Sequence, residues 1–297
     1  MNRFHSAFLL LAVSALAASA QSRPAITGIA FVRMYSSGSA ASDAFYGKTL
    51  GFEKSAGADG VARYGVNEAQ WLEVEALPAN PPATRLPEVA FTTRDAAGLE
   101  RYLVAHKIAL ASKLKNGSFT VDDPEGNLIG FVQQGVMHGK LKLSPRATSR
   151  RIIHAGFLVH DRAAEDAFYR DLLGFNLYWQ GGQTDGRTDY VSMQVPDGTD
   201  WIEYMISDGK DVSARHLGVM NHFSLGVAHM SDAVAALARN GCTDAACSKT
   251  QMGRDGKVQL NLYDPDLTRV EFMEFLPSGT ICCSPFHGKQ PGEEESH

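Results

Sequence analysis

The sequence predicts an α+β protein in which four strand–helix–strand–strand–strand units form two open-barrel domains. Three observations support this prediction. Short motifs of the N-terminal half recur in the C-terminal half in the same order. The periodicity of apolar residues changes from alternating to helical and back within each half. Finally, Gly- and Asp-rich turns separate the apolar runs.

The repeated motifs divide the chain into two related halves. Several motifs in one order, at slowly drifting offsets, are the signature of an internal repeat. Asp-Ala-Phe-Tyr occurs at 43–46 and 166–169, Leu-Gly-Phe at 50–52 and 173–175, Trp-Leu/Ile-Glu at 71–73 and 201–203, and Asp-Pro at 123–124 and 264–265.

Each half divides again into two units, which is clearest in the second half. We expect strands at 151–159, 176–180, 189–195 and 201–206, with a helix over 161–174, and then strands at 221–227, 258–263 and 269–275, with a helix over 231–240. In the first of these helices, Ala164, Phe168 and Leu172 lie on one stripe, and Gly174 stands where a helix would end. The order of elements therefore repeats four times, at roughly sixty residues per unit.

The N-terminus has the composition of a secretory signal. An uncharged apolar run from Ala7 to Ala18 is followed by small residues at the positions that a signal peptidase reads, up to Ala20. The run is too short to span a bilayer as a helix. We therefore expect a secreted or periplasmic protein that begins at Gln21. Mass spectrometry of the mature protein from its native host tests this, and a start at Met1 would contradict it.

The predicted organisation follows from these boundaries: a signal peptide (1–20), an N-terminal domain (21–135), a linker (136–150), a C-terminal domain (151–277) and a tail (278–297). The sequence is 44% hydrophobic and 21% charged, as in a soluble globular protein, and its net charge is -5. Scattered Lys and Arg residues argue against a nucleic-acid partner. We also expect no membrane partner; the sequence leaves the oligomeric state open.

Four cysteines lie in the C-terminal part, at 242, 247, 282 and 283. In an exported protein they are expected to form disulfides, and four cysteines allow three pairings. Because sequence neighbours rarely bond to each other, we expect Cys242 or Cys247 to be linked to the tail.

Four candidate metal ligands occur at equivalent places of the two C-terminal units. His154 and His222 lie in the first strands of these units, and Glu203 and Glu271 lie in the last strands. Each His precedes its Glu by 49 residues. If the two units face each other across a pseudo-twofold axis, the four side chains converge on one point.

The surroundings of these residues favour a metal site over four unrelated polar side chains. Alternation along the strand would place Ile152, His154, Gly156 and Leu158 on one face. Glu203 and Glu271 are flanked by apolar residues, and burial of a carboxylate is costly unless it is paired or binds a metal. Two imidazoles with two carboxylates suit one divalent ion: Zn, Ni, Fe or Mn.

These motifs resemble the vicinal-oxygen-chelate superfamily, which includes glyoxalases, bleomycin-resistance proteins and extradiol dioxygenases. The resemblance covers nearly all of residues 25 to 277. It rests on the strand around His154, the helix that ends at Leu-Gly-Phe, and the strands that carry Glu203 and Glu271. It implies paired strand–helix–three-strand modules that form open barrels, with metal ligands on the first and last strands.

The first half departs from the ligand pattern. Aligning the repeats sets Gly28 against His154, Glu73 against Glu203, Glu88 against His222 and Gly130 against Glu271. Two carboxylates without imidazoles form a poor transition-metal site. We therefore expect the first half to be a degenerate domain without a metal.

The resemblance implies two competing reactions. In a glyoxalase- or epimerase-like isomerase, the metal stabilises an enolate, and Glu271 or Glu203 moves the proton. We expect this reaction, because the His/Glu/His/Glu set is complete. The alternative is an extradiol ring-cleaving dioxygenase, in which His154, His222 and Glu271 would form the metal triad.

Two features count against the dioxygenase. Glu203 would occupy a position that this chemistry needs open, and Asn261 stands where the family's dioxygenases carry a Tyr, with Tyr263 two residues further on. We also expect no counterpart of an additional acid–base His between His222 and Glu271.

A third possibility is a non-catalytic small-molecule binding protein of the bleomycin-resistance type, against which the complete ligand set argues. Export argues against a glutathione-linked lyase, which works in the cytosol. The predicted partner is a small molecule that chelates the metal through two adjacent oxygens.

Overall fold

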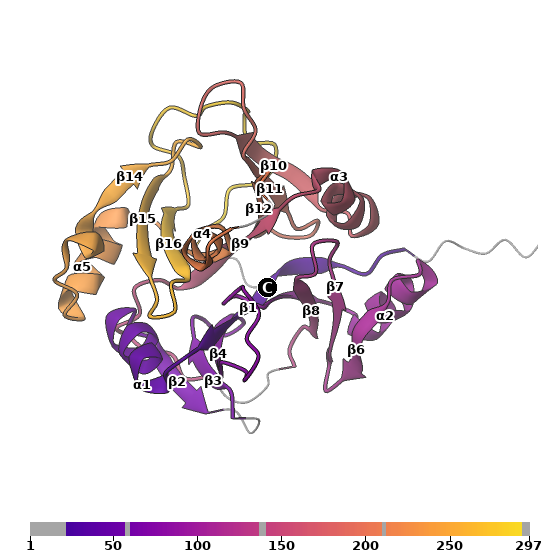
Figure 1. Cartoon of the computed structure of the whole chain (residues 1–297), viewed down its shortest axis with the longest axis horizontal. Coiled ribbons are helices and arrows are strands. Elements are labelled where there is room, and N and C mark those ends of the chain that lie inside the picture. Colours follow the sequence, from indigo (N-terminus) through magenta and orange to yellow (C-terminus); the bar gives the residue numbers. More distant parts are fainter. Residues whose placement is uncertain (1–21, 57–59, 137–140, 210–211, 293–297) are drawn as a thin grey trace, which may run out of the picture.

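Two curled eight-stranded sheets, one in each half of the chain, form the body of the protein (Figure 1). The computed structural model describes residues 22–56, 60–136, 141–209 and 212–292. The predicted signal peptide therefore lies outside the described residues. No helix in the described part of the chain has both the length and the hydropathy of a bilayer-spanning segment.

The first half contains two of the predicted units. The first unit consists of β1 (Ile26–Ser36), α1 (Ser39–Ser42) with a π-helical continuation (Asp43–Thr49), β2 (Glu53–Ala56), β3 (Ala62–Gly65) and β4 (Trp71–Ala76). The second consists of β5 (Glu88–Thr93), α2 (Ala96–Ala105), β6 (Leu110–Lys115), β7 (Ser118–Asp122) and β8 (Leu128–Gln133). Their strands join in the order β2-β3-β4-β1-β5-β8-β7-β6.

The second half repeats this plan. Its first unit consists of β9 (Arg151–Val159), α3 (Arg162–Glu165) with a π-helical continuation (Asp166–Leu172), β10 (Asn176–Gly181), β11 (Tyr190–Gln194) and β12 (Trp201–Ile206). The second unit follows α4 (Ala214–Met220) and consists of β13 (His222–Val227), α5 (Met230–Arg239), a 3-10 turn (Ala245–Ser248), β14 (Thr250–Met252), β15 (Val258–Tyr263) and β16 (Arg269–Glu274). The strand order is β10-β11-β12-β9-β13-β16-β15-β14, so the predicted fold class is confirmed.

Local signals explain the helix that precedes β10. The side chain of Asp161 accepts a hydrogen bond from the backbone N–H of Ala164 and caps the N-terminus of α3. The helix ends just before Gly174, whose φ of 76° is a left-handed conformation that glycine adopts without strain. Phe168 and Tyr169 are buried between these ends, which fixes the helix against its sheet.

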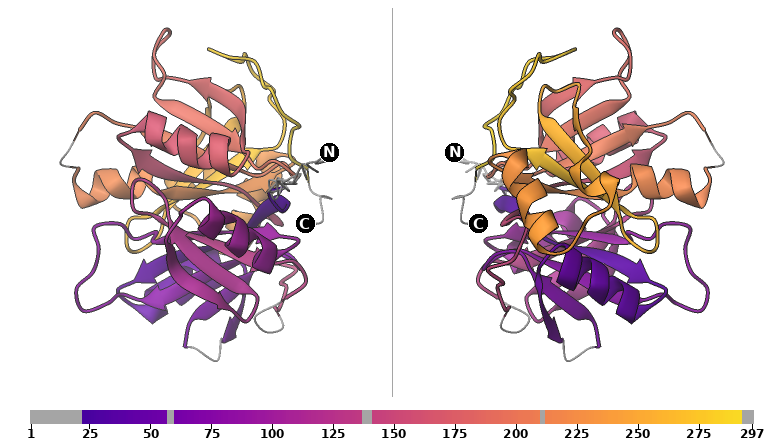
Figure 2. Two further views of the ribbon diagram at one scale, coloured as in Figure 1. Left: turned by 90° about the vertical axis from the view of Figure 1, so that its right-hand side faces the viewer. Right: turned by 90° about the vertical axis from the view of Figure 1, so that its left-hand side faces the viewer.

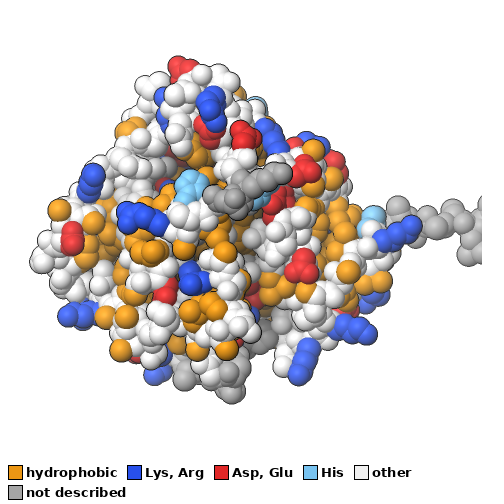
Figure 3. All heavy atoms as spheres, viewed as in Figure 1, with side chains coloured by type: hydrophobic (Ala, Val, Ile, Leu, Met, Phe, Trp, Pro, Cys, Tyr) orange, Lys and Arg blue, Asp and Glu red, His pale blue; other side chains and the backbone are white. Residues whose placement is uncertain are grey.

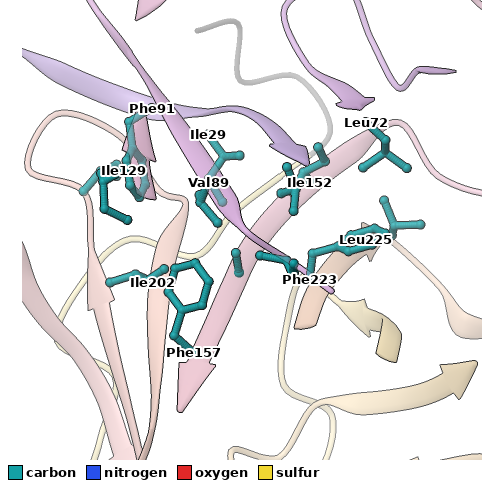
Figure 4. Packing of buried hydrophobic residues seen from close by; sticks show 14 of the residues in the cluster. Ile29, Leu72, Val89, Phe91, Ile129, Ile152, Phe157, Ile202, Phe223 and Leu225 are labelled. Atoms are coloured by element: carbon teal, nitrogen blue, oxygen red, sulfur yellow. The ribbon is translucent and has the colours of Figure 1, made fainter. Parts of the chain in front are cut away.

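The largest hydrophobic cluster draws residues from both sheets, so the two halves share a core. Figure 4 shows Ile29 and Val89 of the first half close to Ile152, Phe157 and Phe223 of the second. A smaller cluster lies on the other face of each sheet: Trp71 is in the first of these, and Trp201 in the second. In Figure 2 the two halves are stacked one above the other.

The repeated motifs also bind the halves together reciprocally. Tyr46 donates a 2.7 Å hydrogen bond to Asp264 of the second half. Tyr169, its counterpart, donates a 3.2 Å bond to Asp123 of the first half. Because these bonds are buried, each contributes to stability on the scale of a hydrogen bond to a charged group, roughly 1.5–3 kcal/mol. The motifs that reveal the repeat are thus the ones that join its copies.

A β-bulge corrects the predicted face of one residue. The pairing between β13 and β9 passes from Ser224–His154 to Leu225–Ile152 and skips Ile153. Ile152 therefore lies in the shared core, and Ile153 packs with Trp201 on the face that carries His154. Strict alternation, which the sequence suggested, fails at this one position because a bulge inserts an unpaired residue.

The cysteine pairing also differs from the prediction. Cys242 is bonded to Cys247, and Cys282 to its neighbour Cys283, so neither Cys242 nor Cys247 reaches the tail. Instead, the tail is held beside β10, where Trp179 donates a hydrogen bond to the carbonyl of Cys282. The turn that follows α5 brings the first pair within 6.1 Å (Cα to Cα), a separation that suits a disulfide.

Candidate metal centre

The four candidate ligands come together on adjacent central strands of the second sheet. His154 (β9), Glu203 (β12), His222 (β13) and Glu271 (β16) occupy the strands in the order β12-β9-β13-β16. Figure 1 labels three of these strands, β9, β12 and β16, near the middle of the second half.

Each carboxylate of this cluster lies within ion-pair distance of an imidazole. The Nε2 atoms of His154 and His222 are 3.1 Å apart. Glu271 Oε2 lies 3.1 Å from Nε2 of His154, and Glu203 Oε2 lies 3.3 Å from Nε2 of His222. One donor atom from each of His154, His222 and Glu271 lies within 4.8 Å of the other two.

Gly156 makes room for this arrangement. It pairs with Glu203 on one side and with His222 on the other. A Cβ atom at this position would overlap the His222 ring. The small residue therefore lets the imidazole lie flat against β9, which brings its Nε2 to that of His154.

Burial and hydrogen bonding orient the imidazoles. Both His side chains are fully buried, and His154 stacks on Trp201 with ring centroids 4.7 Å apart. Nδ1 of His222 lies 2.8 Å from the carbonyl oxygen of Met220. When this imidazole is neutral, Nδ1 carries the proton, and the lone pair of Nε2 points at the carboxylates. A backbone partner of this kind is typical of metal-ligating histidines.

Burial and neighbouring charges also shift the pKa values of the candidate ligands. Burial lowers the pKa of His222, and the positive charge of Arg269 lowers it further. Burial alone would raise the pKa of Glu271, but the hydrogen bond to His154 and the charge of Arg269 hold it at about 2. Burial would also raise the pKa of Glu203, but the hydrogen bond that Nε2 of a protonated His222 donates to it lowers the pKa and prevails. Both carboxylates are thus ionised at neutral pH.

The two carboxylates differ in exposure. The side chain of Glu271 is 3% exposed, and that of Glu203 is 14% exposed. Both line a cavity of about 650 Å³ that opens beside β11 and α4. Glu203 is therefore the more accessible carboxylate from the cavity, while Glu271 is held against His154. Glu274, which the sequence set aside, accepts a hydrogen bond from the backbone of Met230 instead.

Two other residues considered from the sequence take no part in the cluster. Asn261 pairs with Glu271 across β15 and β16, and its buried Oδ1 has no hydrogen-bond partner among the described residues. Tyr263 is 42% exposed. His229 lies between His222 and Glu271 in the sequence, but it is exposed just before α5 and does not line the cavity.

Sequence reasoning missed two cationic side chains. Arg269 lies two residues before Glu271, so strand alternation alone could have placed it on the same face. Lys257 is fully buried, and its ammonium lies 5.3 Å from the centre of the Trp201 ring and donates to the hydroxyl of Tyr178. Burial lowers the pKa of Lys257 to about 8. No pattern in the sequence signals this buried lysine.

The equivalent place in the first half is filled by a guanidinium. Phe31 faces Trp71 in the register in which His154 faces Trp201, so the predicted alignment of Gly28 with His154 is wrong and Phe31 is its counterpart. By the same register Arg33 corresponds to Gly156. The sequence alignment was right for Glu73, Glu88 and Gly130.

Arg33 bridges the two carboxylates of the first half. Its guanidinium nitrogens lie 2.6 Å from Glu73 and 2.7 Å from Glu88, both of which are buried. Arg63 and Trp71 also donate to Glu73. The guanidinium of Arg33 thus occupies the place in the first half that corresponds to the cluster of four candidate metal ligands in the second half.

The fold and the cluster together define a class: a two-domain protein of paired β-α-β-β-β modules in which the second sheet carries two buried imidazoles beside two carboxylates. Residues 151–272 match the model of the Glyoxalase/Bleomycin resistance protein/Dioxygenase superfamily. The C-terminal half of the chain is therefore a domain of this superfamily. No curated protein sequence gives a significant match.

Solved structures with the same fold include ring-cleaving dioxygenases. Homoprotocatechuate 2,3-dioxygenase from Arthrobacter globiformis is 17% identical, with a TM-score of 0.62 over 85% of this chain and 80% of that chain. The enzyme from Brevibacterium fuscum, in an anaerobic complex with 3,4-dihydroxyphenylacetate, is 18% identical, with a TM-score of 0.62 over 85% and 82%. A variant of that enzyme reaches a TM-score of 0.65 at 16% identity, over 92% and 76%. At these identities the likeness establishes the two-domain fold.

Proposed function

We propose that this protein is an exported metal-dependent enzyme that moves a proton beside a carbonyl group of a small molecule, as glyoxalases and epimerases do. The observation that carries the proposal is the convergence of two imidazoles and two carboxylates: each carboxylate lies within 3.3 Å of an imidazole nitrogen, and both line one cavity.

The donor set fits a divalent cation. The cluster brings together two ionised carboxylates and the Nε2 lone pair of a neutral His222, with few N–H or O–H groups to donate hydrogen bonds to them. Burial of such groups is costly unless a cation neutralises them. Imidazole and carboxylate ligands suit Zn, Ni, Fe or Mn. When bound, the ion would act as a Lewis acid on two adjacent substrate oxygens. His154, His222 and Glu271 would hold it, with Glu203 at the side that faces the cavity.

Glu203 is the better candidate for the proton-transferring group, and Glu271 for the permanent ligand. A general base must reach the proton that it removes. The 14% exposure of Glu203 toward the cavity meets this requirement, whereas Glu271 is almost fully enclosed. Glu203 would take a proton from the carbon beside the carbonyl and return it to the neighbouring position.

The two glutamates therefore respond differently to neutralisation. Glu203→Gln should keep most of its metal and lose turnover by roughly 10²- to 10⁴-fold, the usual contribution of a general base. Glu271→Gln should lose metal first. The measurement combines metal content with deuterium wash-in from D2O into a panel of small hydroxy- and ketocarbonyl compounds, followed by NMR. Full wash-in by Glu203→Gln would contradict its assigned role.

The second candidate function is extradiol ring cleavage. It is favoured by the compact set His154, His222 and Glu271, which has the composition of a triad that leaves positions open for a substrate and O2. Asn261 and the nearby Glu203 argue against it. Oxygen uptake by iron- or manganese-loaded protein on a catechol panel would favour this reaction, and its absence would favour proton transfer. Ligand binding without any metal would favour the binding-protein alternative.

A further inference from the structure

Arg269 is a cation that lines the candidate cavity without a hydrogen bond or close ion pair to any described residue. It pairs with His222 across β13 and β16, and it lines the same cavity as Glu203 and Glu271. Its Nε is buried and has no hydrogen-bond partner, and its guanidinium makes no ion pair with any described residue. A buried donor in this state costs free energy until an acceptor arrives.

The other arginines of this cavity are already paired. Arg187 lies 2.8 Å from Asp189, and Arg254 is paired with Asp185. Both pairs are partly exposed, with the Arg187 side chain 65% exposed. Arg269 thus differs from them in lying beside the candidate ligands and in having no close ion pair among the described residues.

A charge count points in the same direction. Glu203 and Glu271 carry two negative charges, which a divalent ion would neutralise. Asp255, which lines the same cavity, is offset by the charge of Lys257. Arg269 then leaves the end of the cavity next to His222 with one positive charge. Guanidinium groups bind carboxylates through two parallel hydrogen bonds, which gives specificity as well as affinity.

We propose that the substrate carries a carboxylate close to its two chelating oxygens, and that Arg269 binds this carboxylate. The inference rests on the proposed metal-dependent function and names the class of substrate for the same site. Arg269 would hold the anion at the His222 side and so fix which carbon faces Glu203. A neutral chelator would leave the guanidinium without an acceptor and bind more weakly.

A matched pair of probes tests the proposal. Isothermal titration calorimetry of the zinc-loaded full-length protein would compare 3,4-dihydroxybenzoate with 3,4-dihydroxybenzamide, which share the same two oxygens and differ in charge. We expect wild-type protein to prefer the acid by roughly 10- to 100-fold, the effect of one hydrogen-bonded charge pair. Arg269→Gln should abolish this preference while keeping its zinc and its affinity for the amide. Arg269→Lys should keep part of it, and the control Arg187→Gln all of it.

The outcomes separate the inference from the proposed function. Zinc binding with equal affinity for both probes, or an undiminished preference in Arg269→Gln, would overturn the role of Arg269 and leave the metal site standing. If wild-type protein binds neither zinc nor the probes, the proposed function fails and this inference falls with it.

Discussion

Replacing His154 and His222 together with alanine is expected to reduce bound metal from one ion per chain to none. Each substitution removes one of the two buried imidazoles whose Nε2 atoms lie 3.1 Å apart, and two carboxylates alone hold a transition metal weakly. Elemental analysis after dialysis measures the loss. Circular dichroism should show that the strands remain folded, because the shared core lies on the opposite face of the sheet.

His229→Ala is the matched control, because His229 is exposed and lies outside the cavity. It should retain the wild-type metal content. A double variant of His154 and His222 that still holds one ion per chain would refute the assignment of these ligands.

Arg33→Met is expected to destabilise the protein by about 3–5 kcal/mol, the usual cost of removing one partner from a buried ion pair. Glu73 and Glu88 are 2% and 3% exposed and would be left without their shared guanidinium. Burial already raises the pKa of Glu88 to about 7 even with Arg33 beside it. Urea denaturation at pH 8, which is above the pKa of Glu88, gives the largest difference from wild type.

The charge explanation can be separated from loss of packing. Adding Glu88→Gln to Arg33→Met removes the uncompensated charge, because Glu73 keeps its ion pair with Arg63, so the double variant should recover much of the lost stability. Metal content should stay at the wild-type value throughout, since these residues lie in the other sheet. A destabilisation below about 1 kcal/mol for Arg33→Met would show that the ion pairs contribute like exposed ones.

The fold could be predicted from the sequence because its signals were redundant. The motifs around Tyr46 and Tyr169 recur at a constant spacing, and apolar runs mark the long strands. The short elements gave no such signal: α4 and the three-residue β14 were not predicted, although the repeated order of elements implied a strand where β14 lies. Short polar segments take their structure from tertiary contacts rather than from periodicity.

The candidate site could be predicted because its four residues occupy equivalent places in two units. The pairing register of the strands could not be predicted from the sequence. The bulge at Ile153 and the correspondence of Phe31 with His154 depend on strand pairing, which a pattern of alternation does not reveal. The role of Arg33 was missed for the same reason, because its position opposite Gly156 appears only once the strands are aligned.

The two halves differ in how the charge of their buried carboxylates is compensated. In each half, carboxylates are buried on the inner face of a curled sheet and need a cation. In the first half Arg33 supplies it within the chain. In the second half, Gly156 leaves that space open, and the imidazoles of His154 and His222 turn into it beside Glu203 and Glu271.

Figure 3 shows that acidic and basic side chains are interspersed over the face of the molecule that it displays.

The most direct test of the metal site is the metal content of wild-type protein purified without oxygen. We expect one divalent ion per chain by elemental analysis. A protein that holds no ion, even after incubation with zinc, nickel, manganese and ferrous iron in turn, would contradict it.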